Sequence, residues 1–224
     1  MKKMVMSLLF LIQFYNVIQG DSVSDDLTSD YNGVVVSKSL MVAAYEGSPQ
    51  ELYSLIVDGA DVNYKDDAGM TPLMYAAQDN SIEKIDMLVA AGADVNAVRD
   101  GGWTVLMYAV GYASVESVDL LLSAGADVNA RNNEGTTVLM CGVSDEISGE
   151  IVDVLLSAGA EVNVQNKLGL TALMYAAYDG LLQTVKLLVN SGADASLRND
   201  DDQTAYDVAV FQEHADIAMF LAFE

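Results

Sequence analysis

The side chains best suited to catalysis or metal binding are few in this sequence. Its 224 residues include one histidine, His214, and one cysteine, Cys141. A Ser–His–Asp triad or a His-rich metal cluster would therefore rest on a single imidazole. The run Asp200–Asp202 lacks the alternating ligands, central glycine and closing glutamate of an EF-hand calcium loop, and no GxxxxGK[ST] or GxGxxG phosphate loop occurs. We expect no enzyme activity, no cofactor and no metal site.

Other carboxylates recur at regular intervals, each directly after a Gly-Ala pair. They are Asp61, Asp94, Asp127, Glu161 and Asp194. A row of catalytic acids would be one interpretation. Loop hydrogen bonding and solvation within a repeated unit explain the same pattern, and we favour that explanation.

The charge balance limits the class of partner. Ten Lys and Arg residues stand against 33 Asp and Glu residues, a net charge of −23. Nucleic acids and anionic membranes are bound by Lys and Arg that displace counterions, so both are excluded as partners. The acidic surface either attracts a protein with a basic patch or only keeps this chain soluble.

The repeated unit appears most clearly in four short segments. "TPLMYAA" at 71–77 returns as "TVLMYAV" at 104–110, "TVLMCGV" at 137–143 and "TALMYAA" at 171–177. Each is followed by a second apolar stretch that ends in a Gly-Ala pair, as in "IEKIDMLVAAGADVN" at 82–96. A fixed period of this length indicates stacked structural repeats.

The residues within one unit predict helix, turn, helix and projecting hairpin. Thr71 is suited to cap a short helix through Leu73–Ala77, with Pro72 at its first position. Apolar residues at helical spacing predict a second helix over Ile82–Ala90, and Gly92 ends it. The polar stretch 93–103 then predicts an extended arm with a tight turn. One unit cannot bury both helices alone, so several must stack.

The segment "DDAGMTPLMYAAQDNSIEKIDMLVAAGADVN" closely resembles an ankyrin repeat, and the resemblance covers roughly residues 38–221. It implies an all-α repeat solenoid of about six repeats with projecting hairpin loops. We place the repeats at 34–63, 64–96, 97–129, 130–163, 164–196 and 197–224, the first and last being caps. The family's histidine after TPL is replaced by Met74, Met107, Met140 and Met174, so we expect apolar packing between repeats instead of a polar link.

The resemblance also suggests structural roles for the two rarest side chains. His214 falls in the turn between the last two helices, where ankyrin repeats often carry a histidine. Cys141 takes the position that tyrosine holds in three other copies, which favours helix packing, with a reactive thiol as the alternative.

The N-terminus differs from the rest of the chain. Residues 1–20 combine Lys2 and Lys3, an apolar stretch and a small residue at its exit, which predicts a signal peptide cleaved near Gly20. A retained membrane anchor is the alternative, but the stretch is short for a span of ~20 residues. Residues 21–33 are expected to form an acidic flexible leader. We therefore expect a periplasmic or secreted protein with no stable membrane insertion after cleavage.

Ankyrin proteins bind partners through a concave face made of hairpin tips and first helices. Carried over to this sequence, the face consists of Tyr45, Asp67, Met70, Asp79, Trp103, Tyr112, Glu134, Asp145, Leu168, Leu170, Tyr178 and Asp179. Tyr and Trp are typical of binding hot spots, and the carboxylates would favour a partner with Lys or Arg. The alternative is that Trp103 and the tyrosines fold back onto neighbouring hairpins.

We therefore predict a monomeric, exported, non-catalytic scaffold that binds another protein. A secreted effector or inhibitor acting on a host or competitor protein is the first alternative, and a periplasmic accessory protein handling a ligand or metal is the second. Locating the mature protein in the periplasm or the medium would separate the first two.

Overall fold

The computed structural model describes residues 25–112, 114–143 and 149–223. These residues form twelve α-helices and no strand, in keeping with the predicted all-α repeat solenoid. The helices are α2 Asp25–Glu46, α3 Pro49–Val57, α4 Pro72–Gln78, α5 Ile82–Ala90, α6 Val105–Gly111, α7 Val115–Ser123, α8 Val138–Cys141, α9 Gly149–Ser157, α10 Ala172–Tyr178, α11 Leu182–Asn190, α12 Ala205–Phe211 and α13 Ala215–Leu221.

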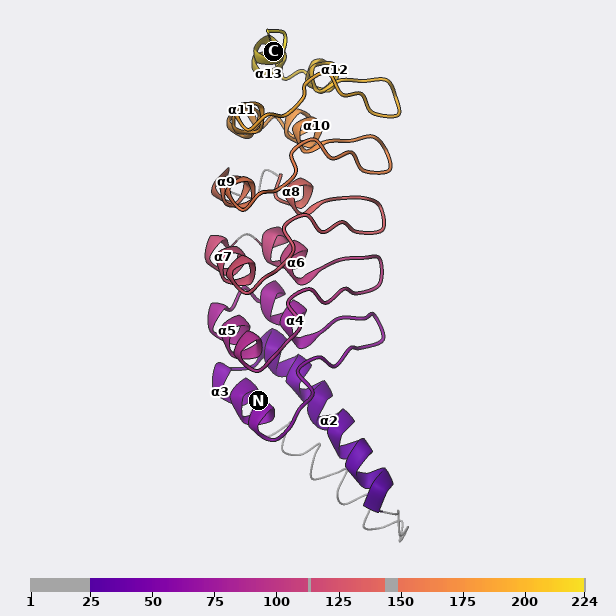
Figure 1. Cartoon of the computed structure of the whole chain (residues 1–224), viewed down its shortest axis with the longest axis vertical. Helices are drawn as coiled ribbons and strands as arrows, with labels where there is room; N and C mark the ends of the chain where they lie inside the picture. The colour runs from indigo at the N-terminus through magenta and orange to yellow at the C-terminus, as the bar shows by residue number, and fades with distance from the viewer. Residues whose placement is uncertain (1–24, 113, 144–148, 224) are drawn as a thin grey trace.

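The helices stand in two parallel rows along an elongated stack (Figure 1). The first helix of each repeat (α2, α4, α6, α8, α10, α12) lies in one row, and the second helix lies in the other. Long loops project beside the first helices, on the side away from the second helices. Neighbouring repeats pack α4 against α6 and α10 against α12, so each repeat is covered mainly by its neighbours in the sequence.

Local capping explains where the short helices begin and end. Thr71, Thr104 and Thr171 are N-caps whose hydroxyls accept hydrogen bonds from backbone N–H groups three residues later. Gly92 follows the end of α5 with a φ of 89°, a left-handed conformation that glycine adopts without the strain of a side chain. The capping predicted from the threonines and glycines is therefore present.

One continuous apolar core runs along the stack. The four methionines that replace the family's histidine, Met74, Met107, Met140 and Met174, are all buried in it. They contribute apolar packing at the position expected from the sequence, since methionine adapts to irregular space between helices.

Asparagine side chains link successive repeats on the exposed turns. Asn96 donates from Nδ2 to the carbonyl of Gly125 (3.0 Å) and accepts at Oδ1 from the N–H of Asp127 (2.8 Å). The same pair of bonds connects each of the other asparagines to the following repeat, and these are Asn63, Asn129 and Asn163. In the following repeat Ser196 takes the place of the asparagine, and among the described residues it bonds only to Asp194 in its own turn, so this asparagine ladder ends there.

The first helix is longer than the sequence analysis expected. Helix α2 starts at Asp25, so residues 25–33 of the segment predicted as a flexible leader are helical. The chain has no proline before Pro49 to interrupt a helix here. Extending a helix that is already formed costs less than starting one, which explains the longer α2.

The predicted signal peptide, residues 1–20, lies outside the described residues. Within the described part of the chain, no helix is both long enough and apolar enough to cross a membrane.

Candidate protein-binding surface

The projecting loops are held by side chains that bond to their own backbone. Oδ1 of Asp66 accepts hydrogen bonds from the N–H groups of Ala68 and Met70, both at 2.9 Å. Asparagines make equivalent bonds in the later loops, at Asn132, Asn166 and Asn199. A polar side chain of this kind fixes a tight turn without a partner strand. Each loop tip is therefore an ordered feature of its repeat.

Adjacent tips also bond to one another. The N–H of Asp200 donates to the carbonyl of Leu168 (3.1 Å), and the N–H of Lys167 donates to that of Glu134 (3.0 Å). Gly169 has a φ of 70°, and a Cβ there would lie 2.8 Å from Cα of Asn199. The tips approach so closely that only glycine fits at this point. We call the surface formed by these tips and the C-terminal ends of the first helices the hairpin face.

The residue before each capping threonine is less exposed than predicted. Met70 was expected to face solvent but is only 7% exposed, which corrects that assignment. Trp103 and Leu170, at the same position in later repeats, are half-buried against the core. The turn bonds draw the backbone of this residue inward, so its side chain packs beside the threonine.

Trp103 lies in a small aromatic cluster that the sequence analysis missed. Its ring is 6.3 Å from that of Tyr108, and the Arg99 guanidinium carbon lies 5.9 Å and 5.6 Å from the two ring centres. Arg99 stands where the other loops have Asp or Asn. This difference between the repeats could have indicated from the sequence that the loop of Trp103 is held in another way. Nε of Arg99 is buried without a hydrogen bond among the described residues, so the contacts with the two rings are its main stabilisation.

Three predicted tyrosines do face solvent. Tyr45, Tyr112 and Tyr178 are 45%, 47% and 57% exposed, at the C-terminal ends of their first helices. Tyr45 contacts the ring edge of Tyr75 at 5.8 Å, and the hydroxyl of Tyr112 accepts a 2.7 Å hydrogen bond from Gln78. These contacts hold the rings in place while leaving one side of each open. The interpretation that they fold back completely is wrong for these residues.

Carboxylates surround the tyrosines. Asp67 and Glu134 are exposed, and Asp179 is half-exposed. Asp79 is exposed but pairs with Lys84 at 2.6 Å, so part of its charge is neutralised within the protein. Burial, followed by its hydrogen bond to Asp66, raises the pKa of the Tyr75 hydroxyl and keeps it neutral. The hairpin face therefore presents carboxylates together with the exposed tyrosines.

The last two predicted partner-binding residues are Leu168 and Asp145. Leu168 is exposed at a loop tip, as expected. Asp145 lies outside the described residues. Of the twelve candidates, the structure brings the tyrosines, Leu168 and most of the carboxylates to one face and draws Met70, Trp103 and Leu170 toward the core.

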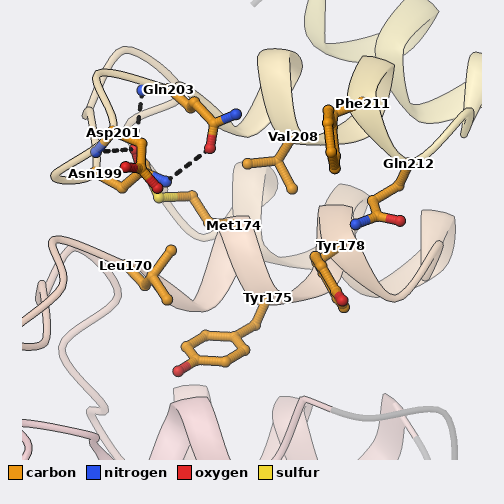
Figure 2. A pocket seen from close by; sticks show the side chains of 10 residues that line it. All are labelled: Leu170, Met174, Tyr175, Tyr178, Asn199, Asp201, Gln203, Val208, Phe211 and Gln212. Atoms are coloured by element: carbon orange, nitrogen blue, oxygen red, sulfur yellow. Dashed lines mark hydrogen bonds between the residues drawn. The ribbon is translucent and has the colours of Figure 1, made fainter.

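A groove of about 450 Å³ lies on the hairpin face at the last two repeats (Figure 2). Its apolar lining consists of Leu170, Met174, Tyr175, Tyr178, Val208 and Phe211. Its polar lining consists of Asn199, Asp201, Gln203 and Gln212. Sequence analysis found the tyrosine and the leucine but missed Phe211, although aligning the last repeat on "TALMYAAY" places it opposite Tyr178.

The two rarest side chains have structural positions. Nε2 of His214 lies 3.1 Å from the carbonyl of Tyr178, where it links the last two repeats. Burial raises the pKa of the Cys141 thiol to about 12, so the thiol stays protonated at neutral pH. Among the described residues no group of His, Cys, Asp and Glu is arranged to hold a metal ion.

The comparisons with known proteins agree with this architecture. A family model described as ankyrin repeats (3 copies) matches residues 40–132 and 139–224. The chain belongs to the ankyrin-repeat family. A comparison with curated proteins found no match.

A solved structure provides a more specific likeness. It is described as the Bd0816 predatory endopeptidase from Bdellovibrio bacteriovorus in complex with immunity protein Bd3460. One of its chains is 31% identical to this one, with a TM-score of 0.77, over 84% of this chain and 98% of that chain. The similar neighbour is the immunity protein, which that structure describes in complex with an endopeptidase.

Proposed function

We propose that this chain is an exported, non-catalytic protein that binds an endopeptidase through its hairpin face and holds it inactive. The observation that carries the proposal is the row of exposed tyrosines at the C-terminal ends of first helices, namely Tyr45, Tyr112 and Tyr178. The likeness to an immunity protein supports the class of partner. The signal-peptide pattern of residues 1–20 supports export.

The tyrosines are suited to supply most of the binding free energy. Each combines a large apolar ring with a hydroxyl and loses few torsions when it is buried. A tyrosine at the centre of an interface contributes about 2 kcal/mol or more. Because Tyr45 and Tyr112 are already positioned by Tyr75 and Gln78, little additional order is lost on binding.

The acidic charge is suited to select the partner and speed its encounter. With a net charge of −23, the chain attracts a protein whose binding patch carries Lys or Arg. An inhibitor of this kind acts by covering the approach to the enzyme's active site and needs no chemistry of its own. We expect the binding unit to be a monomer, since two such acidic chains repel each other.

An envelope capture experiment tests the proposal. The chain without residues 1–20 is immobilised, exposed to an envelope extract of its native host, and the retained proteins are identified. We expect an endopeptidase whose activity falls when equimolar chain is added back. Retention without any endopeptidase, or an endopeptidase that keeps full activity, contradicts the proposal.

A matched pair of variants tests the surface. Replacing both Tyr112 and Tyr178 with alanine should weaken binding by at least about 30-fold, in line with ~2 kcal/mol for a hot spot. Tyr53→Ala is the control, because Tyr53 is equally exposed but lies on the second helix α3. If the double variant and Tyr53→Ala weaken binding equally, the partner binds elsewhere on the protein.

Fractionation of the native host into periplasm and medium tests export.

A further inference from the structure

The last two repeats place aromatic side chains at the same position in succession. Tyr178 ends α10 and Phe211 ends α12, and Phe211 is 74% exposed. The equivalent residues of the second and third repeats are Gln78 and Gly111. Aromatic residues at this position in two successive repeats therefore occur only at this end of the stack. Tyr178 and Phe211 both line the groove (Figure 2).

The groove is large and its floor is apolar. Leu170, Met174 and Val208 line it on the side of the two aromatic rings that faces the last loop tip. Its volume of about 450 Å³ falls within the range of small-ligand pockets, roughly 300–1,000 Å³. It is thus larger than one side chain requires and can also admit the backbone on either side of that side chain.

A carboxylate lies at the hairpin end of the groove. Asp201 lines it from the last loop tip, next to the amides of Asn199 and Gln203. In the same tip Asp202 pairs with Arg198 at 3.6 Å. The carboxylate of Asp201 makes no hydrogen bond or ion pair within the described part of the chain, so its charge is available to a ligand.

Charge decides which ligand the groove accepts. An anionic group would meet Asp201 and the neighbouring Asp200, and a second copy of this chain would bring its own net charge of −23. Both are disfavoured by like-charge repulsion. A segment with a cationic side chain next to an apolar one can pair with the carboxylate of Asp201 and pack on the apolar floor at the same time.

We propose that the groove between the last two repeats binds an extended segment of the partner protein with a large apolar side chain next to Arg or Lys. The apolar side chain lies between Tyr178 and Phe211, and the cation faces Asp201. The inference rests on the proposed function, because it names the part of the endopeptidase that the hairpin face grips. It assigns the specificity of the interaction to the C-terminal end of the stack.

The test uses the full chain without residues 1–20, labelled with ¹³C at the methionine methyl groups, and a matched set of short peptides. The peptides are identical except for a central Phe-Arg, Phe-Glu or Ser-Arg pair. We expect Phe-Arg to shift the methyl signal of Met174, which lines the groove, while Met219 on α13 does not move. Phe-Glu should bind at least about fivefold more weakly, the upper range for an exposed ion pair, and Ser-Arg should not bind measurably.

Two variants with matched controls locate the contacts. Phe211→Ala should lower the affinity for the Phe-Arg peptide by at least about tenfold. Asp201→Asn should abolish the preference for the Phe-Arg peptide over the Phe-Glu peptide. The controls are Phe223→Ala, an exposed aromatic outside the groove, and Asp100→Asn, an exposed acid on another loop tip. Both should bind as the parent does. All four residues are exposed, so the variants are expected to fold, and circular dichroism checks this.

The outcomes separate this inference from the proposed function. An unmoved Met174 signal at millimolar peptide, or equal affinity for Phe-Arg and Phe-Glu, overturns the assignment of the groove. If the captured endopeptidase still binds Phe211→Ala as tightly as the parent, the scaffold function stands and the groove assignment fails. If no endopeptidase is captured but the peptide preference holds, the groove assignment stands and the class of partner is wrong.

Discussion

The two ends of the stack are built from the same repeat but finish differently. At the N-terminal end, the long helix α2 is tied to the second repeat by Lys84, whose side chain is almost fully buried. Its ammonium group donates to the carbonyls of Ala43, Tyr45 and Gly47 at 3.2–3.4 Å and pairs with Asp79. Carbonyls at and just after the end of α2 gain a donor from the next repeat in this way.

At the C-terminal end, apolar residues remain uncovered. Tyr206 is 40% exposed, whereas Leu173, at the same position one repeat earlier, is 1% exposed. Val210 is 51% exposed, whereas its equivalent Ala177 is fully buried.

The difference shows that the position of a residue in the repeat does not decide alone whether it belongs to the core. A neighbouring repeat must also pack on it, because stability in a solenoid comes from the interfaces between units. The N-terminal end therefore contributes mainly to stability. Within the described residues, the last repeat carries apolar side chains at such positions with no unit packed on them.

The largest expected effect separates the interior of the stack from its C-terminal end. Met107→Ala should lower the free energy of unfolding by about 3 kcal/mol, because it leaves a cavity in a closed interface. Met219→Ala, on the exposed side of α13, should change it by less than about 0.5 kcal/mol. Urea unfolding followed by circular dichroism measures both. Similar losses would show that the C-terminal end is as well packed as the interior.

The next effect concerns the N-terminal end. Lys84→Ala should lower the free energy of unfolding by about 2 kcal/mol, because it removes the hydrogen bonds that Lys84 donates to three carbonyls and its ion pair with Asp79. Hydrogen exchange should show α2 and α3 losing protection before the other helices. Lys186→Ala is the control, since Lys186 contacts only the ring of Phe220 among the interactions observed. Uniform loss of protection along the stack would contradict a role for Lys84 confined to this end.

The smallest expected effect concerns the asparagine ladder, in which Asn96 is an internal member and Ser196 marks the end. Asn96→Ala should lower the free energy of unfolding by about 1 kcal/mol, because it removes two hydrogen bonds to the next repeat. Ser196→Ala should lower the free energy of unfolding by less than about 0.5 kcal/mol, since the described bonds of Ser196 lie within its own turn. Differential scanning calorimetry of both variants checks the order. A larger loss for Ser196 would mean that the ladder does not couple the repeats.

Most of the fold could be predicted from local pattern. The capping threonines, the left-handed glycines and the buried methionines all lie where the repeat period places them. The beginning of α2 could not be predicted so well, because residues 21–33 carry no repeat pattern. Helix extension there depends on the helix that follows.

The candidate site could be predicted only in part. Tyr45, Tyr112 and Tyr178 were found because they follow the helix pattern that recurs in each repeat, and their exposure agrees. Met70 was misplaced because its burial arises from a turn held by Asp66, a contact that spacing does not show. The stacking of Trp103 with Arg99 and Tyr108 likewise depends on how the loop folds against the helix.

The sequence by itself determined the family and the acidic charge, because these depend on residue types and period alone. Only the tertiary structure decided which side chains of the hairpin face stay open. It also showed that Tyr178 and Phe211, 33 positions apart in the chain, enclose one groove. The physical reason is that exposure and shape arise between repeats, where contacts join residues that no local pattern connects.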